Sequence, residues 1–248
     1  MDDEFEIILD MPDRKPDSAT GSQFIDLIST VPQNIRDEAT LDQLMEGNVP
    51  TYLRKLLPVD ITFGKNKLTY FVTPDYLSIG HDNDFVRMPL SAISAQKIAY
   101  YFRCCLPTRK MVIDIWRSSV IRLEPIEIFG APDTQLIKQH NDLITGQMLG
   151  AFGLMSGAKR DVVVSTGLQK SPSSGYLYGF MNPNGTPRQP LNGKRSSGSC
   201  DYSMGVRLVS RTAVWNDEPI DLFDMMINTP VVHMVSDEGP LHKPYYDV

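Results

Sequence analysis

Segments with the apolar spacing of helices and segments with the pattern of strands occur in separate blocks along this chain. In the middle, Ala95, Ile98, Ala99 and Phe102 follow the i, i+3, i+4, i+7 rule and predict a helix with one buried face. After Gly157, short strand-like runs are separated by loops rich in Gly, Pro, Ser and Asn. Because regular strand–helix–strand alternation is missing, we predict an α+β fold with helices packed on one face of a mostly antiparallel sheet.

Turn and cap residues place the other expected elements. A hairpin is predicted around the turn at 64–67. The acidic, proline-containing residues 1–20 are expected to form a flexible leader, and residues 21–248 a single α+β domain. The remaining expected elements are helices over 22–31, 35–46 and 136–144, strands over 56–72, 76–79, 85–88, 162–164, 176–181 and 206–209, and a last short helix from Thr229-Pro230.

The composition argues against several classes of function. The 248 residues carry a formal net charge of -6, whereas surfaces that bind nucleic acid are normally basic, so no nucleic-acid partner is expected. The longest apolar runs are a few residues, too short to span a membrane, and the acidic start is unlike a secretory signal. Three cysteines, two of them adjacent, form no disulfide framework, which favours a cytoplasmic protein. No cofactor motif is found.

Two compact polar clusters, 157–161 and 201–207, each lead into a strand-like segment. Charges of both signs beside Gly and strand-forming residues predict ion pairs at the end of a sheet, the arrangement that a binding or catalytic pocket uses. If buried, these charges must be paired. A network that only fixes the sheet ends explains them equally well. The residues expected to form such a buried ionic network are Lys159, Asp161, Asp201 and Arg207.

Cys104 and Cys105 directly precede a helix that we expect Pro107 to open. A helix N-terminus carries partial positive charge, which lowers the pKa of a thiol and makes thiolate available for nucleophilic attack, as in papain-like enzymes. The alternative is that these cysteines fill space in the core, as unpaired cysteines commonly do.

His140 is the best candidate for a general base, with Asn141 and Asp142 beside it. It also falls on the apolar stripe of its own helix, where a buried histidine without a catalytic role is the commoner outcome. No pair of histidines or cysteines has the spacing of metal ligands, so no metal site is predicted. The loop over 192–199 is expected to be a mobile flap or a disordered insertion.

Several segments resemble those of a poorly characterised group of bacterial proteins, many of them exported. The resemblance covers nearly all of the chain after residue 20 and implies a shared fold without implying an activity. Export of such relatives would differ from the cytoplasmic location expected here. The segments that carry the resemblance are Glu46-Gly47-Asn48-Val49-Pro50 with Leu53-Arg54, Pro74-Asp75-Tyr76-Leu77, Leu106 to Val112, Gln139-His140-Asn141, Gly157 to Val163, Gly185-Thr186-Pro187, Asp201 to Val209 and Ser236-Asp237-Glu238-Gly239.

This chain departs from that group at two histidines. Ala158 stands where the group has histidine in Gly-His-Lys-Lys-Asp, and Met204 where it has histidine in Asp-Tyr-Ser-His-Gly-Val-Arg. Neither Ala nor Met can carry a proton at neutral pH. If the histidines serve as base or metal ligand in relatives, this chain has lost both, and a non-catalytic relative becomes a serious alternative.

Two functional hypotheses follow. In the first, the protein is a cysteine-dependent amidase or peptidase, in which Cys104 or Cys105 attacks an amide, His140 moves the proton and Asp161 or Asp201 orients that base. The ligand, a small peptide-like or carboxylate-bearing molecule, would be held by Lys159, Ser203 and Arg207. In the second, the protein keeps the fold and the cleft but only binds or interacts.

Overall fold

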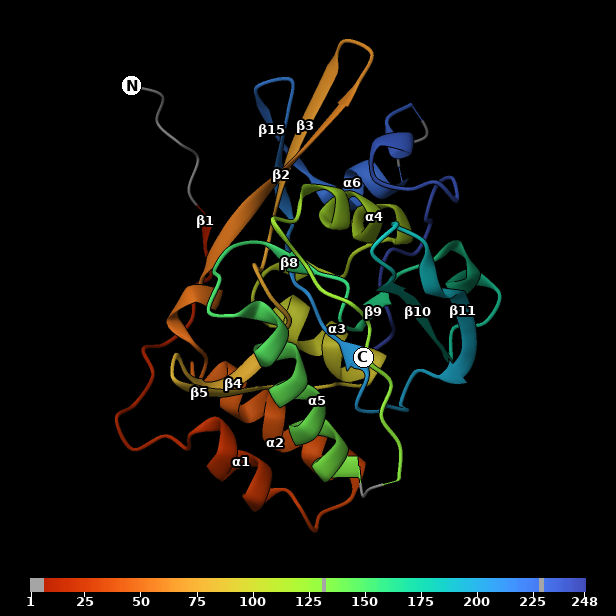
Figure 1. Cartoon of the computed structure of the whole chain (residues 1–248). Helices are drawn as coiled ribbons and strands as arrows, with labels where there is room; N and C mark the ends of the chain where they lie inside the picture. Colours follow the sequence, from red (N-terminus) through yellow and green to blue (C-terminus); the bar gives the residue numbers. More distant parts are fainter. Residues whose placement is uncertain (1–6, 131–132, 228–229) are drawn as a thin grey trace, which may run out of the picture.

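A long hairpin organises the fold. The strands β2 (Lys55–Phe63) and β3 (Asn66–Val72) pair antiparallel around a turn at Gly64, whose φ of +59° suits glycine. This confirms the predicted hairpin. The computed structural model describes residues 7–130, 133–227 and 230–248 (Figure 1).

The hairpin forms the centre of the larger sheet, whose strand order is β1-β2-β3-β13-β6, with β14 also pairing with β3. Every strand pair in this sheet is antiparallel. The additional strands are β1 (Ile7–Ile8), β6 (Cys104–Cys105), β13 (Val209–Ser210), β14 (Thr212–Trp215) and β15 (Glu218–Asp221).

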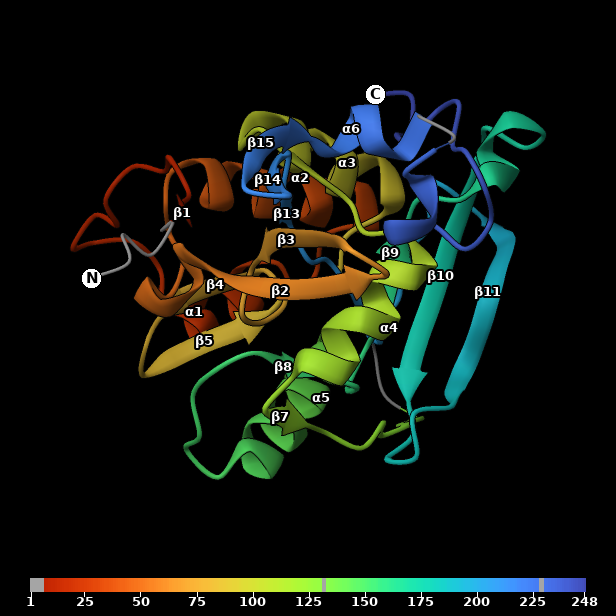
Figure 2. The ribbon, with the colours of Figure 1, turned by 90° about the horizontal axis from the view of Figure 1, so that it is seen from above.

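A smaller sheet has the order β11-β10-β9-β12. Its long hairpin, β10 and β11, runs along one side of the molecule in both ribbon views (Figures 1 and 2). The edge strand β12 pairs parallel with β9. The bounds are β9 (Arg160–Val163), β10 (Ser174–Met181), β11 (Pro187–Ser196) and β12 (Met204–Gly205), and the two-stranded ladders are β4 (Ser78–His81) with β5 (Asp84–Arg87) and β7 (Ile121–Arg122) with β8 (Met155–Ser156).

The helices begin where side chains cap them. Thr20 and Gln23 form a capping box at the start of α1, and Ser91 and Thr108 cap α3 and α4. In Figure 1, α1, α2 and α5 lie together at the end of the molecule opposite the tip of the β2–β3 hairpin. The bounds are α1 (Gly21–Leu27), α2 (Gln33–Met45), α3 (Ala92–Tyr101), α4 (Arg109–Ser118), α5 (Asp133–Met148) and α6 (Leu222–Ile227), with short 3-10 turns at Thr51–Leu53, Thr166–Gln169 and Val232–Met234.

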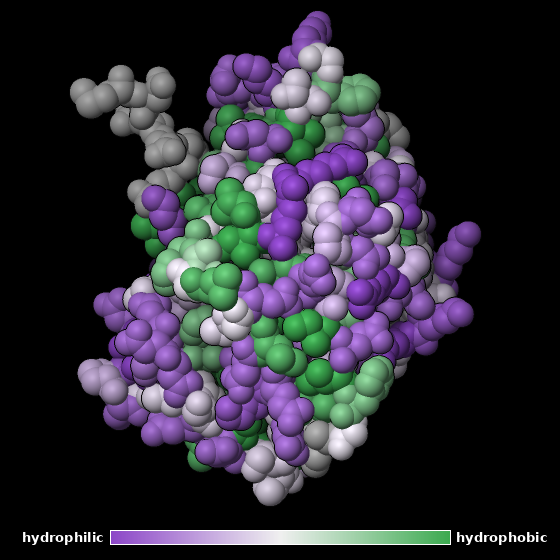
Figure 3. All heavy atoms as spheres, viewed as in Figure 1, coloured by the Kyte–Doolittle hydropathy of each residue, from purple (hydrophilic) through white to green (hydrophobic). Residues whose placement is uncertain are grey.

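One large apolar cluster draws residues from Leu9 to Tyr246. The Tyr246 hydroxyl donates to the carbonyl of Val163, which ties the C-terminal segment to β9. The side of the molecule seen in Figure 3 shows apolar patches separated by polar residues. The chain therefore has the expected α+β fold, and its helices and mostly antiparallel strands share a core. Within the described residues, no helix is both long enough and apolar enough to cross a membrane.

Three local expectations differ from the structure. Residues 7–20, expected to be a flexible leader, pack on the domain: Leu9 is buried and Arg54 donates to the carbonyls of Met11 and Pro12. Most of the expected flap at 192–199 is strand β11, because it pairs with β10. The last short helix, expected to start at Thr229-Pro230, is a single 3-10 turn at Val232–Met234, and Thr229 falls outside the described residues.

Candidate functional site

The two polar clusters of the sequence meet in the smaller sheet. Arg160 lies opposite Met204, and Asp161 opposite Gly205, in the parallel pair of β9 and β12. Adjacent side chains on a strand point to opposite faces. The charges of the first cluster are therefore divided between the protein interior and a surface pocket.

Asp161 and Arg207 form a pair inside the protein. The carboxylate Oδ1 of Asp161 lies 3.8 Å from Nε of Arg207, and the Tyr76 hydroxyl donates to its Oδ2 at 3.2 Å. Arg207 also donates to the carbonyls of Thr73 and Met155, which come from two different segments. Burial raises the pKa of Asp161 to about 7. These partners give both residues a role in fixing the interior.

A second buried ion pair joins Arg87 of β5 to Asp75. The guanidinium Nη2 lies 2.7 Å from the Asp75 carboxylate, and both side chains are almost fully buried. Arg87 also donates to the Asn141 side chain on α5, and the Tyr52 hydroxyl donates to Asp75. Our sequence analysis missed this pair, although a single charge between Val86 and Met88 in an apolar stretch is a usable signal.

His140 and Lys159 are in contact with each other inside the protein. Nζ of Lys159 lies 3.5 Å from Nδ1 of His140 and donates to the carbonyl of Tyr202 at 2.8 Å. Burial lowers the pKa of Lys159 to about 7, with the charge of Arg87 acting in the same direction. Burial and the nearby Lys159 charge lower the pKa of His140 to about 3. The imidazole is therefore neutral at physiological pH.

The remaining charges of the clusters form a network at the surface. Asp201 pairs with Arg160 at 2.7 Å and with Arg195 at 2.6 Å. Ser203 donates its backbone N–H and its hydroxyl to the same carboxylate. Burial favours the neutral acid, but the Ser203 hydrogen bonds and the two arginines outweigh it and hold the pKa of Asp201 below its usual value.

This network forms part of a pocket of about 470 Å³, which we call the arginine pocket. Its wall includes Phe180, a non-glycine residue with φ of +53° that follows Gly179 in β10. The backbone N–H of Phe180 donates to the carbonyl of Lys159, the residue just before β9, and this bond holds the strained conformation. The pocket is lined by Glu127, Phe129, Asp133, Leu136, Arg160, Phe180, Arg188, Gln189, Arg195, Asp201, Tyr202 and Ser203.

The pocket and the buried pair are separated by aromatic rings. The rings of His140 and Tyr202 pack edge to face, with centroids 5.1 Å apart, and Phe180 lies 6.4 Å from His140. Phe180 and Tyr202 line the pocket, whereas His140 and Lys159 do not. A ligand in the pocket would thus contact the rings, and His140 would support them from behind.

The cysteines occupy a different part of the fold. Cys104 and Cys105 form β6, which pairs with β13, and both are fully buried. The expectation that Pro107 opens the following helix is wrong, because Thr108 caps α4 and the helix begins at Arg109, so the thiols lie in a strand ahead of its first turn. Burial raises the pKa of Cys104 to about 12, the opposite of the expected lowering. Among the described contacts, neither thiol is hydrogen-bonded to His140.

The predicted site residues therefore divide into three groups. Asp201 and Ser203 line the arginine pocket, and His140 with Lys159 lie behind its wall. Asp161 and Arg207 pair with each other in the interior, and the cysteines belong to the larger sheet. Arg160 and Tyr202 lie in the two polar clusters but were not among the predicted site residues. Phe180, Arg188 and Arg195 lie outside the clusters, and sequence reasoning did not predict them as site residues.

The acids beside His81 serve a structural purpose. Asp82 accepts hydrogen bonds from the backbone and hydroxyl of Thr51, and Asp84 accepts two from Ser22. These bonds attach the β4–β5 turn to neighbouring segments. No group of three or more potential metal ligands occurs among the residues that the structure describes.

Comparison with protein families, curated proteins and solved structures finds no match for this chain. The function is therefore argued from the chain's own contacts.

Proposed function

We propose that this protein binds a small peptide-like ligand with a free carboxylate in the arginine pocket. The observation that carries the proposal is that three arginines line the pocket, while Asp201 is the one described carboxylate that pairs with any of them. Arg160 and Arg195 share the single carboxylate of Asp201, and Arg188 donates to the Asn182 side chain and the Pro125 carbonyl. Arg188 has no carboxylate partner among the described residues. This side of the pocket can therefore accept an anion.

The rest of the lining suits a peptide end. Leu136, Phe180 and Tyr202 offer apolar and aromatic surface, which favours an uncharged side chain of the ligand. Glu127, from the segment before α5, is exposed and lacks a cationic partner among the described residues, and it can attract a ligand ammonium group. The lining thus offers arginines for a carboxylate and Glu127 for an ammonium, the two charged groups at the ends of a dipeptide.

The binding test compares Ala-Leu with its C-terminal amide by isothermal titration calorimetry. We expect the free carboxylate to bind about tenfold more tightly, because a charge-assisted hydrogen bond to arginine is lost in the amide. Arg188→Gln should remove most of that difference. Arg188 is chosen because it pairs with no acid, so its replacement leaves no carboxylate unpaired.

Arg117→Gln is the matched control, since Arg117 is 71% exposed and forms only a 3.8 Å pair with Asp114. It changes the net charge equally and should leave both affinities unchanged. Equal binding of acid and amide, an identical effect of the two arginine variants, or no binding of Ala-Leu would each reject the proposal.

The cysteine-dependent hydrolase stays a prediction. Its two thiols lie in a strand of the larger sheet, while the polar residues that it would need lie in or behind the arginine pocket. The contacts favour the binding hypothesis for this reason.

A further inference from the structure

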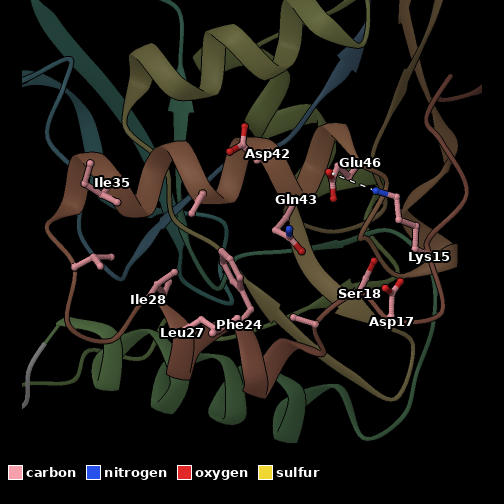
Figure 4. Close-up of a pocket in the computed structure, with 13 residues that line it drawn as sticks. Lys15, Asp17, Ser18, Phe24, Leu27, Ile28, Ile35, Asp42, Gln43 and Glu46 are labelled. Atoms are coloured by element: carbon pink, nitrogen blue, oxygen red, sulfur yellow. Dashed lines mark ion pairs between the residues drawn. The ribbon is translucent and has the colours of Figure 1, made fainter.

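A groove of about 590 Å³ opens between α1 and α2 and shares no lining residue with the arginine pocket. We call it the α1–α2 groove (Figure 4). Its lining combines apolar residues of both helices and their connection with polar residues of the 15–19 segment and of the end of α2. The members are Lys15, Asp17, Ser18, Ala19, Phe24, Leu27, Ile28, Val31, Ile35, Ala39, Asp42, Gln43 and Glu46.

The apolar part of the groove has a buried base and an exposed rim. Phe24 and Ile28 are each only 3% exposed, whereas Leu27 is 69% and Ile35 43% exposed. A single exposed leucine needs no explanation. Two large exposed aliphatic side chains beside a hollow with an apolar base form a surface that gains free energy when another apolar group covers it.

The polar part of the groove is acidic. Lys15 forms a solvent-exposed pair with Glu46 at 3.5 Å, while Asp17 and Asp42 have no cationic partner among the described residues. Asp26 lies in an adjoining hollow that also includes Asp17 and Leu27. The surface around Leu27 thus carries more acids than bases.

The two kinds of residue are separated along the groove. Figure 4 shows Ile28 and Ile35 toward one end, and Asp17 and Glu46 toward the other. The 13 residues of α2 span roughly 20 Å at a rise of about 1.5 Å per residue. A short helix or an extended segment of similar length matches this wall.

We propose that the α1–α2 groove docks a short cationic, amphipathic segment of another protein. Apolar side chains of that segment cover Leu27 and Ile35, and its Lys or Arg residues lie beside Asp17 and Asp42. Charge complementarity selects this occupant, because a second copy of this chain would bring the same acidic rim and a net charge of -6. The inference is independent of the ligand proposed for the arginine pocket.

The test uses a fluorescently labelled peptide of about twelve residues, with Leu at helical i, i+3, i+4, i+7 spacing and Lys elsewhere. Anisotropy titration with the full chain should show saturable binding, and the same peptide with Glu in place of Lys should not bind. Leu27→Ala and Ile35→Ala should each weaken binding about fivefold to tenfold. Asp17→Asn with Asp42→Asn should weaken it about threefold at low salt and less at high salt.

Leu149→Ala is the control for the aliphatic variants, since Leu149 is 91% exposed and lies outside the groove. Asp142→Asn with Asp224→Asn removes the same charge as the double aspartate variant and should leave binding unchanged. If the peptide were attracted only by the net negative charge of the protein, the Asp17/Asp42 and Asp142/Asp224 double variants would weaken binding equally. Leu27→Ala would then have no effect. That result, equal binding of the Glu peptide, or no saturable binding would overturn the proposal.

Discussion

The environment of a buried ionisable side chain shifts its pKa in this protein. Lys159 is the clearest case, because its Nζ contacts only a carbonyl and the imidazole of His140 in the interior. No carboxylate among the described residues lies within ion-pair distance of it. Burial therefore acts on its charge without direct compensation, which is why the pKa falls from 10.5 to about 7.

Replacing Lys159 should change how stability depends on pH. Between about pH 7 and 10.5, the unfolded chain keeps a proton on Lys159 that the folded protein has lost, so the contribution of Lys159 to stability rises with pH. We expect the wild type to gain more free energy of unfolding between pH 7.5 and 9.5 than Lys159→Met. Urea denaturation at both pH values measures this, with Lys97→Met, an exposed helix position, as control. Equal gains in wild type and Lys159→Met would contradict the assignment.

The two core thiols should be inert. A rise in the Cys104 pKa from 9.0 to about 12 reduces the thiolate fraction at pH 8 about a thousandfold, and burial blocks access further. Iodoacetamide followed by peptide mass spectrometry should find Cys104 and Cys105 unmodified in the native protein and alkylated in urea. Native alkylation as fast as that of free cysteine would revive the hydrolase hypothesis.

The short helix α1 depends for its stability on the residues that cap its N-terminus. The start of α1 is set by Thr20, whose hydroxyl accepts from the Gln23 backbone while the Gln23 side chain accepts from the Thr20 backbone. Because α1 has only seven residues, its end contributes a large share of its stability. This helix also forms one wall of the α1–α2 groove.

Thr20→Ala should lower the free energy of unfolding by about 1 kcal/mol, since the backbone N–H of Gln23 loses the hydroxyl that accepts its hydrogen bond. Thermal or urea denaturation measures this, with Thr62→Ala on the exposed part of β2 as the comparison. A loss no larger than that of Thr62→Ala would show that the capping box does not stabilise α1.

The whole molecule depends on contacts between distant segments. Several apolar positions that the helical and strand patterns marked as inward do lie in the shared core, among them Ile98, Ile137 and Val162. His140 also lies inward, as its place on the stripe of α5 indicated. These features follow from local periodicity, which a sequence displays directly.

Strand pairing between distant segments explains where the sequence-based predictions were wrong. The segment around Arg195 has the loop composition expected of a flap, yet it is a strand because its backbone hydrogen bonds reach β10. Cys104 and Cys105 precede a proline and a helix, yet they lie in the sheet because β13 provides a partner strand. The local composition of a segment does not show which distant strand it will pair with.

The amino-acid sequence by itself determined the α+β class, the main hairpin, most of the helices and the two polar clusters, since each depends on residues close together in the chain. Only the tertiary structure decided which charges meet. Asp201 reaches Arg160 and Arg195, while Asp161 reaches Arg207, because β9, β11 and β12 come together with alternate side chains on opposite faces. The position of a pocket depends on this assembly, which sequence spacing does not encode.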